Sequence, residues 1–393
     1  MENITTIQKR ISVSDVSILF LFSAFTCIAI MSDNNFVATP WWSLNSLNIL
    51  IIFTILALSI NLISYNVSTK EYFLAIFLFL LAFVTTYTTK NSTCALDLAW
   101  IFILRKVNIK QFIWTILITN LILFFLTWLS YRMGSTLDFT NSVSGKHSLG
   151  FGNPNTLGQV AAVLIITSLI LQMIKGINNI SLFSLNLFAL GLLYVSGSRG
   201  ALVISFCAYI VYGALRKNFL PERNQRILIF FYLFSLIFIV IFSFYSTGES
   251  VYTSGSFLNI LDKIFTNRIG LNNYFMNQYG LSWFGQRVDY SYGSSIGLDV
   301  QYAVLDNGIL KSFINYGILY TLSIFFLSYL LCKRMIRFEQ NWILVPLVSF
   351  CFYGFVEQGF NSFWVNFTIG LLGSVFNTKP VFLKQLPTQK DGK

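Results

Sequence analysis

The stretch ILIFFYLFSLIFIVIFSF, residues 227–244, decides the fold of this chain. It carries no charged side chain, and a helix of about 20 such residues crosses the roughly 30 Å hydrocarbon core of a bilayer. A shorter run at 94–104 precedes the basic residues Arg105 and Lys106, which favours a further crossing there. Similar apolar segments recur at 16–32, 47–64, 72–89, 112–130, 158–174, 180–196, 201–215, 309–331, 342–358 and 361–377. The sequence therefore predicts an all-α, polytopic membrane helix bundle, a single domain over 1–393 with about twelve transmembrane helices.

Composition agrees with this class and excludes several others. Of 393 residues, 55% are hydrophobic and only 10% are charged, whereas soluble domains carry about 25% charged residues. The chain has one His, no Gly-rich phosphate loop, no HExxH and no DxD pair, so nucleotide hydrolysis and zinc chemistry lose support. We expect no cofactor and no metal. Packing is the expected role of the five cysteines, Cys27, Cys94, Cys207, Cys332 and Cys351.

The basic residues indicate how the chain is oriented. With twelve crossings, most of the 26 lysines and arginines fall on the side of both termini, which is the cytoplasmic side by the positive-inside rule. We therefore expect a multi-pass protein of the cytoplasmic membrane with cytoplasmic termini, and no nucleic-acid partner despite the formal charge of +11. The minority on the outer side are Lys90, Arg132, Lys146, Arg199, Lys263, Arg268, Arg287 and Lys311.

Two outer loops are long, at 131–157 and 245–308. In the second, Phe257, Ile260, Leu261, Ile264 and Phe265 follow helical spacing and predict an amphipathic helix. Such a helix can lie on the outer membrane face. The loop is either a lid that seals the bundle or, given its tyrosines and Trp283, a platform for sugar rings.

Three inward-running helices are predicted to begin on the outer side with polar caps. Asn153 precedes Pro154, Ser198 precedes Arg199, and either Asp306 or Asn307 precedes the helix that carries Lys311. Free backbone N–H groups at such helix starts favour anions. Arg199 is either a bidentate phosphate clamp or a residue that snorkels to the interface. Arg268 could simply face solvent, and the loop residue His147 is either solvated or catalytic.

Four stretches together resemble the O-antigen polymerase and ligase superfamily, in particular the Wzy-type polymerases of lipid-linked polysaccharides. They are GFGNPNTLG at 150–158, SGSRGAL at 196–202, TNRIGL…WFGQ within 266–286, and LDNGILKSFINYGIL at 305–319. A looser fifth element is Glu357 followed by Asn366. The resemblance lies in the order, spacing and shared sidedness of these motifs from about residue 145 onward. It implies a GT-C-like bundle with one large extracytoplasmic loop.

The resemblance also implies a reaction and a site. Arginines hold the diphosphate of an undecaprenyl-diphosphate-linked oligosaccharide while an acceptor hydroxyl attacks its anomeric carbon, and the product is a capsular, exo- or O-antigen polysaccharide. The diphosphate ligands implied or suggested are Arg199, Arg268, Arg287 and Lys311, with Asn153, Asn155 and Asn307 at the helix caps. Asp306 stands where ligases place a His, which favours a polymerase. Asp306 is thus the first candidate for the general base, followed by Glu357 and His147.

Two other classes remain open at this point. A lipid-linked oligosaccharide flippase would also be basic and polytopic, although two related halves and a cavity at the membrane midplane would be expected. A ligase or a scaffold of an envelope-synthesis complex is a further alternative. For a polymerase, the expected partners are the lipid-linked oligosaccharide, membrane lipid, and the chain-length regulator and flippase of the same pathway.

Overall fold

The computed structural model describes residues 12–32, 46–136, 138, 145–175, 180–217, 219–220, 224–264, 268–289 and 305–376. Within these ranges the chain is helical and contains no strand. The longer helices are α1 (Val13–Ser32), α2 (Ser46–Ser64), α3 (Thr69–Thr89), α4 (Thr93–Ile103), α5 (Ile109–Arg132), α6 (Pro154–Lys175), α7 (Ile180–Ser196), α8 (Arg199–Arg216), α9 (Gln225–Tyr245), α10 (Phe257–Ile264), α11 (Arg268–Tyr279), α13 (Ile318–Arg337) and α14 (Leu344–Val356). The expected all-α class is confirmed for the described part of the chain.

Eight helices in the described ranges are long and apolar enough to cross a membrane. They are α1, α2, α3, α5, α6, α8, α9 and α13. Two shorter apolar helices, α7 and α14 with its preceding turn, join them in the bundle. The chain is therefore a multi-pass membrane protein by the length and composition of its helices.

Helix α4, the shortest of the apolar segments in the sequence, lies antiparallel to α3. Its outgoing turn η1 (Leu104–Lys106) meets the first turn of α3, where Arg105 Nε lies 3.7 Å and Lys106 Nζ 3.0 Å from the Glu71 carboxylate. Glu71 also completes the capping box of α3 with Ser68. The basic residues after α4 and the start of α3 therefore lie on the same side of the bundle, as their charges indicated.

Two of the last three apolar segments do not form the single helices that the sequence predicted. The expected span 309–331 is divided into α12 (Gly308–Lys311), a π-helical turn η4 (Ser312–Tyr316) and α13, with a break at Gly317. Gly317 has φ 94°, and a Cβ there would lie 2.3 Å from the Gly285 nitrogen. The backbone at Trp283, Phe284 and Gly285 therefore occupies the space that a continuous helix with a side chain would need.

The segment expected to span at 361–377 is likewise irregular. It consists of η6 (Gln358–Asn361), turns, α15 (Thr368–Leu371) and η7 (Leu372–Phe376). Asn361 Nδ2 donates to Gly308 O at 2.8 Å, and Asn366 Nδ2 donates to Phe360 O at 2.9 Å. Non-helical backbone at membrane depth is tolerated where protein covers it, and both asparagines are buried.

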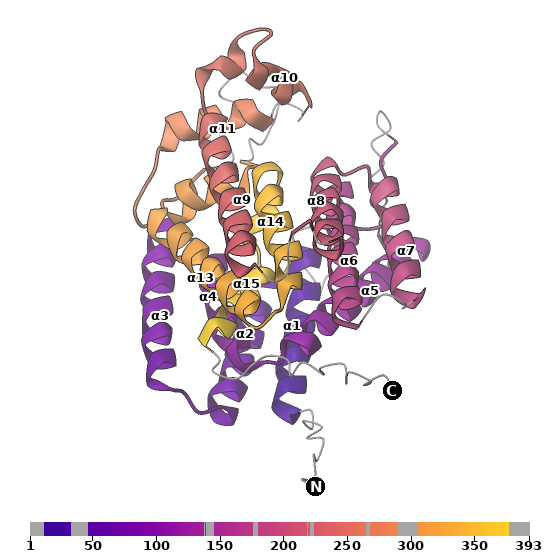
Figure 1. The fold of residues 1–393 in the computed structure, drawn as a ribbon, viewed down its shortest axis with the longest axis vertical. Helices are drawn as coiled ribbons and strands as arrows, with labels where there is room; N and C mark the ends of the chain where they lie inside the picture. Colours follow the sequence, from indigo (N-terminus) through magenta and orange to yellow (C-terminus); the bar gives the residue numbers. More distant parts are fainter. Residues whose placement is uncertain are drawn as a thin grey trace, which may run out of the picture.

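One hydrophobic core joins the N-terminal and C-terminal parts of the bundle. Phe22 and Phe25 of α1 pack edge-on against Trp100 of α4, and Phe25 and Phe363 ring centroids are 5.0 Å apart. The expected amphipathic helix is present as α10 over 257–264, and Phe265 lies outside the described residues. Phe257 and Ile260 are exposed, while Leu258 is buried. Helices α10 and α11 lie at one end of the molecule, beyond the ends of α8, α9 and α14 (Figure 1). That end carries the candidate site.

Candidate functional site

Arg268 joins two carboxylates that come from distant parts of the sequence. Its Nε lies 3.1 Å from Asp306 Oδ2, and its Nη1 donates to Glu357 Oε1 at 2.9 Å. The same Nη1 also donates to the backbone carbonyl of Val356 at 2.9 Å. Three of the residues expected in the site, from three separate motifs, are thus in direct contact.

Local structure explains how each member is held. Arg268 is the first residue of α11, and that helix start is capped by Asp262, whose Oδ1 accepts from Ile269 N at 2.7 Å and Gly270 N at 3.0 Å. Glu357 is the extended residue that ends α14, with φ −146° and ψ 138°. Asp306 precedes the cap of α12. All three are therefore at the ends of helices rather than within them.

The cap of α12 is Asn307 and not Asp306. The Asn307 side chain accepts from Leu310 N at 3.0 Å, so of the two residues that sequence analysis allowed, the second is the cap. Asp306 is consequently not needed for helix capping, and its carboxylate is available to Arg268.

Two glycines let backbone and side chains approach Glu357 closely. A Cβ on Gly200 would lie 2.4 Å from Glu357 Cγ, and one on Gly308 would lie 2.7 Å from Glu357 O. Gly200 belongs to the SGSRGAL motif and Gly308 to LDNGIL. These motifs therefore meet around Glu357, with glycine where any larger residue would collide.

The cluster holds one positive charge against two carboxyl groups. Burial raises the pKa of Glu357 to about 7, opposed by Arg268 and reinforced by Asp306. Burial also raises the pKa of Asp306, against the opposing charges of Arg268 and Lys311. Two carboxyl groups that lie close together retain a proton more readily than an isolated carboxyl group does, because each disfavours the ionisation of the other. Near neutral pH the pair can accept or release a proton.

The other three predicted diphosphate ligands differ in their position relative to this cluster. Lys311, on α12, donates from Nζ to Gln358 Oε1 at 2.6 Å, next to Glu357 in sequence. Arg199 is exposed at the start of α8, directly before Gly200. Arg287 is exposed on segment 281–289, and among the described residues it takes no part in the ion pairs of Arg268.

The predicted caps of α6 and α8 are confirmed. Asn153 Oδ1 accepts from Asn155 N at 2.8 Å, and α6 begins at Pro154. Ser198 Oγ accepts from Ala201 N at 3.4 Å at the start of α8. A Cβ on Gly158 would lie 2.5 Å from Ser198 Cβ, so the first turns of α6 and α8 are in tight contact.

His147 forms a pair with an acid that sequence analysis missed. Its Nδ1 lies 2.8 Å from Asp138 Oδ2, and Asp138 Oδ1 accepts from Ser148 N, Ser148 Oγ and Leu149 N at 2.7, 3.0 and 3.0 Å. Burial would raise the pKa of Asp138, but the hydrogen bonds from His147, Ser148 and Leu149 outweigh it and lower that pKa. The carboxylate therefore organises the loop as much as it orients the imidazole.

Among the described residues there is no group of three or more His, Cys, Asp or Glu side chains that could hold a metal ion. No protein family, no curated protein and no solved structure matches this chain. The geometry of the site is therefore the basis for any functional assignment.

Four contributors to the site went unrecognised in the sequence. Gln358 follows Glu357 directly, and Asp262 lies six residues before Arg268. Their closeness in sequence to predicted site residues was the only sign that either contributes to the site. Gly200 was part of the SGSRGAL motif, but nothing in the neighbouring sequence predicted that Glu357 packs against it. Asp138 offered no signal beyond sharing an outer loop with His147.

Proposed function

We propose that this protein polymerises lipid-linked oligosaccharide repeat units at the outer face of the cytoplasmic membrane. The observation that carries the proposal is the contact of Arg268 with Asp306 and Glu357. An arginine that can bind a diphosphate and a carboxyl pair that can take a proton are the two groups that metal-free glycosyl transfer from a diphosphate requires.

The ion pairs suggest how donor binding activates the base. A carboxylate held by arginine is a weak base, because the cation stabilises its charged form. The diphosphate of the donor would compete for the guanidinium of Arg268, whose planar donors suit phosphate oxygens. Asp306, with 20% of its side chain exposed, would then be released from Arg268 toward the acceptor. Donor binding would thereby raise the basicity of Asp306.

The transfer step then follows directly. The acceptor hydroxyl gives its proton to the Asp306 carboxylate as its oxygen forms a bond to the anomeric carbon of the donor sugar. The bond from that carbon to the diphosphate oxygen breaks, and the electron pair leaves with the lipid diphosphate, whose charge Arg268 neutralises. Arg199, the first residue of α8, and Lys311, the last residue of α12, would provide further positive charge. Glu357 would hold Arg268 in place and act as the second candidate base.

The proposed topology has about twelve crossings, cytoplasmic termini, and the loop at 245–308 outside. It is supported by the basic residues Arg105 and Lys106 beside the start of α3, and by the meeting of the starts of α6, α8 and α11 with the end of α14. The site would therefore face the side on which lipid-linked repeat units are displayed.

Asp306→Asn tests the chemistry. Because Asn307 is the helix cap, the substitution leaves the start of α12 intact while removing the base. We expect polymer synthesis by the purified protein to fall by about 10²- to 10⁴-fold, with undecaprenyl-diphosphate-oligosaccharide still bound. Activity within a few-fold of the parent would remove Asp306 from the mechanism.

Glycolipid analysis after loss of the protein separates the classes. A polymerase leaves single repeat units on lipid at the outer leaflet, and a flippase leaves them at the inner leaflet. A ligase leaves completed polymer on the lipid. Accumulation of either of the last two products would overturn the proposal.

A further inference from the structure

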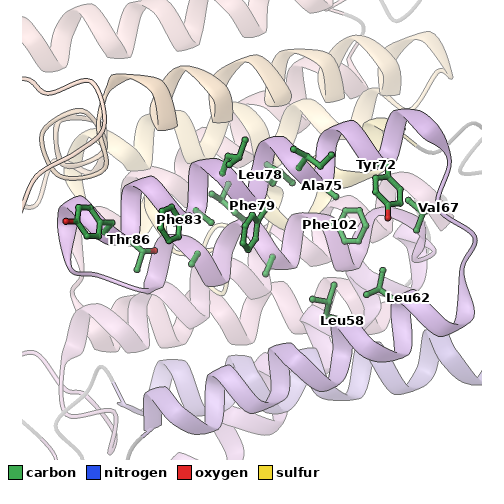
Figure 2. Close-up of a pocket in the computed structure, with 17 residues that line it drawn as sticks. Leu58, Leu62, Val67, Tyr72, Ala75, Leu78, Phe79, Phe83, Thr86 and Phe102 are labelled. Carbon is green, nitrogen blue, oxygen red and sulfur yellow. The ribbon is translucent and has the colours of Figure 1, made fainter.

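An open groove of about 840 Å³ runs between α2, α3 and α4 (Figure 2). Its lining is almost entirely hydrocarbon, with Leu58 and Leu62 from α2, Leu98 and Phe102 from α4, and a long row of side chains from α3. The volume falls within the roughly 300–1,000 Å³ of small-molecule sites. The groove lies apart from the ion pairs of Arg268, so it calls for a separate explanation.

Small side chains give the groove its depth. Both α2 and α3 pack on α4, and α4 lines the groove between them with Ala95 and Ala99. On α3, the groove is lined by the small side chains of Ala75 and Ala82 together with the exposed rings of Phe79 and Phe83. The result is a groove in the side of the bundle, open toward the membrane rather than toward water.

The groove is longer than one leaflet. Its lining on α3 extends from Tyr72 to Tyr87, which is about 22 Å at 1.5 Å per residue. One leaflet supplies only about half of the 30 Å hydrocarbon core. A single phospholipid acyl chain would therefore leave part of the groove unfilled, whereas a polyprenyl chain can follow its whole length.

The end of the groove at Tyr87 adjoins the segment that leads to the candidate site. Lys90 Nζ lies 4.4 Å from the centre of the Tyr87 ring, and Thr88 Oγ1 donates to Phe284 O at 2.7 Å. Gln286, two residues after Phe284, donates from its backbone N to Asn315 O at 3.0 Å. Asn315 lies one turn after Lys311. Because lysines lie near both ends of α3, charge alone does not give the direction of the lipid. The contact between Thr88 and Phe284 gives it.

We propose that the groove binds the polyprenyl chain of the lipid-linked donor, with the diphosphate at the Lys90 end. This inference rests on the proposed function, because it assigns the chain of that same donor. The isoprenoid tail would lie against α3 and α4 while the diphosphate passes along segment 283–286 toward Lys311. The groove would thus select for a long isoprenoid chain over ordinary membrane lipid.

Groove-filling substitutions test this on the purified full-length protein in phospholipid nanodiscs. Ala82 is about 12 Å and Ala75 about 22 Å along α3 from Lys90, so a tryptophan at each blocks a different depth. Phe77→Trp is the matched control, since Phe77 is an exposed residue of α3 outside the lining. The probes are undecaprenyl diphosphate and farnesyl diphosphate, whose chain is short enough to end before Ala75.

We expect Ala75→Trp and Ala82→Trp to weaken undecaprenyl diphosphate binding at least tenfold, and Phe77→Trp to leave it unchanged. Farnesyl diphosphate should lose affinity with Ala82→Trp but not with Ala75→Trp. A photoreactive group at the far end of an undecaprenyl chain should also label the inner half of α3 or α4 in the unsubstituted protein, which requires no variant to fold.

Three results would overturn the groove assignment. They are parental binding by Ala75→Trp and Ala82→Trp, photolabelling outside α3 and α4, and phospholipid in the groove that undecaprenyl diphosphate does not displace. The polymerase proposal fails separately. If the chain binds in the groove but purified protein forms no polymer from the oligosaccharide-linked lipid, the function is wrong and the groove stands. Normal polymer synthesis by Ala75→Trp with parental binding would instead exclude the groove and leave the polymerase function in place.

Discussion

Glu357 occupies the place where Gly200 would carry a side chain. A Cβ on Gly200 would lie 2.4 Å from Glu357 Cγ and 2.8 Å from its Oε1. The two residues come from α8 and from the end of α14, and Glu357 in turn holds Arg268. The position of the Arg268 guanidinium therefore depends on residue 200 having no side chain.

Gly200→Ala should displace Glu357 and disturb the ion pairs of Arg268. We expect a loss of about 1–3 kcal/mol in stability from the overpacked contact, together with a large fall in polymer synthesis. Gly213→Ala on the same helix is the control, because no atom lies within 4 Å of its added Cβ. That variant should keep its activity and gain up to about 1 kcal/mol from the better helix propensity. Thermal unfolding in detergent and synthesis assays compare them, and equal behaviour of the two would contradict the packing argument.

Arg268→Lys should abolish most polymer synthesis although the positive charge remains. The guanidinium reaches Asp306 through Nε and Glu357 through Nη1, while an ammonium lacks this fork and its fixed geometry. Arg216→Lys, at the opposite end of α8, is the control and should retain parental activity. Normal polymer length and abundance with Arg268→Lys would show that charge alone suffices.

The rate of polymer synthesis should rise as pH increases through about 7. Burial raises the pKa of Glu357 to about 7, so the Asp306 and Glu357 pair loses its shared proton near neutrality and gains a free carboxylate. Glu357→Gln should move this acid limb to lower pH, which a pH–rate profile measures. Stability should change in the opposite sense: a carboxyl group whose pKa is raised by folding favours the folded state below that pKa, and this contribution disappears as pH rises. An acid limb that stays in place in Glu357→Gln would exclude the pair as its source.

His147→Gln should lower polymer synthesis by less than about tenfold. Asp138 accepts three hydrogen bonds from Ser148 and Leu149 besides its contact with His147, so the pair is expected to organise the loop more than to transfer protons. Asp138→Ala should therefore be the more damaging change, with the N–H groups of Ser148 and Leu149 left without their acceptor. Limited proteolysis of the loop and turnover are measured together. A fall of about 10² or more with His147→Gln in a well-folded protein would assign the base to His147.

The proposed topology is tested by single cysteines in a protein that lacks its five natural ones. Asn224 caps the start of α9, and Ser254 is an exposed residue in the segment that follows the end of α9. In intact cells an impermeant thiol reagent should modify Ser254→Cys and not Asn224→Cys. Modification of Asn224→Cys in sealed cells would reverse the sidedness of the site.

Hydropathy predicted the helices well where each helix is continuous. Helices α1, α2, α3, α5 and α9 begin and end within a few residues of their expected limits, because long apolar runs without Gly or Pro leave the backbone few alternatives to a helix in lipid. Helix caps were also predictable, since Asn153, Ser198 and Asn307 act through hydrogen bonds to residues two or three positions later.

Contacts between distant segments could not be read from local patterns. Nothing near Gly317 predicts that the backbone of Gly285 occupies its side-chain space, and the break in the expected span follows from that contact. The pairing of Arg268 with Glu357 was likewise invisible, although each residue stood out alone in its own motif. Tertiary packing selects among several possible partners, and a single sequence does not reveal that choice.

The break at Gly317 also makes the folding of helix α13 depend on the loop segment that precedes it. The first N–H groups of a helix have no partner within it, and in α13 those of Ile318 and Leu319 donate to Ser282 O at 2.9 Å and Trp283 O at 3.1 Å. Ser282 and Trp283 precede α13 in the chain, so they are synthesised first, and in the proposed topology they must cross the membrane before α13 can use them. If that topology holds, a loop that fails to cross would leave the first N–H groups of α13 without their acceptors.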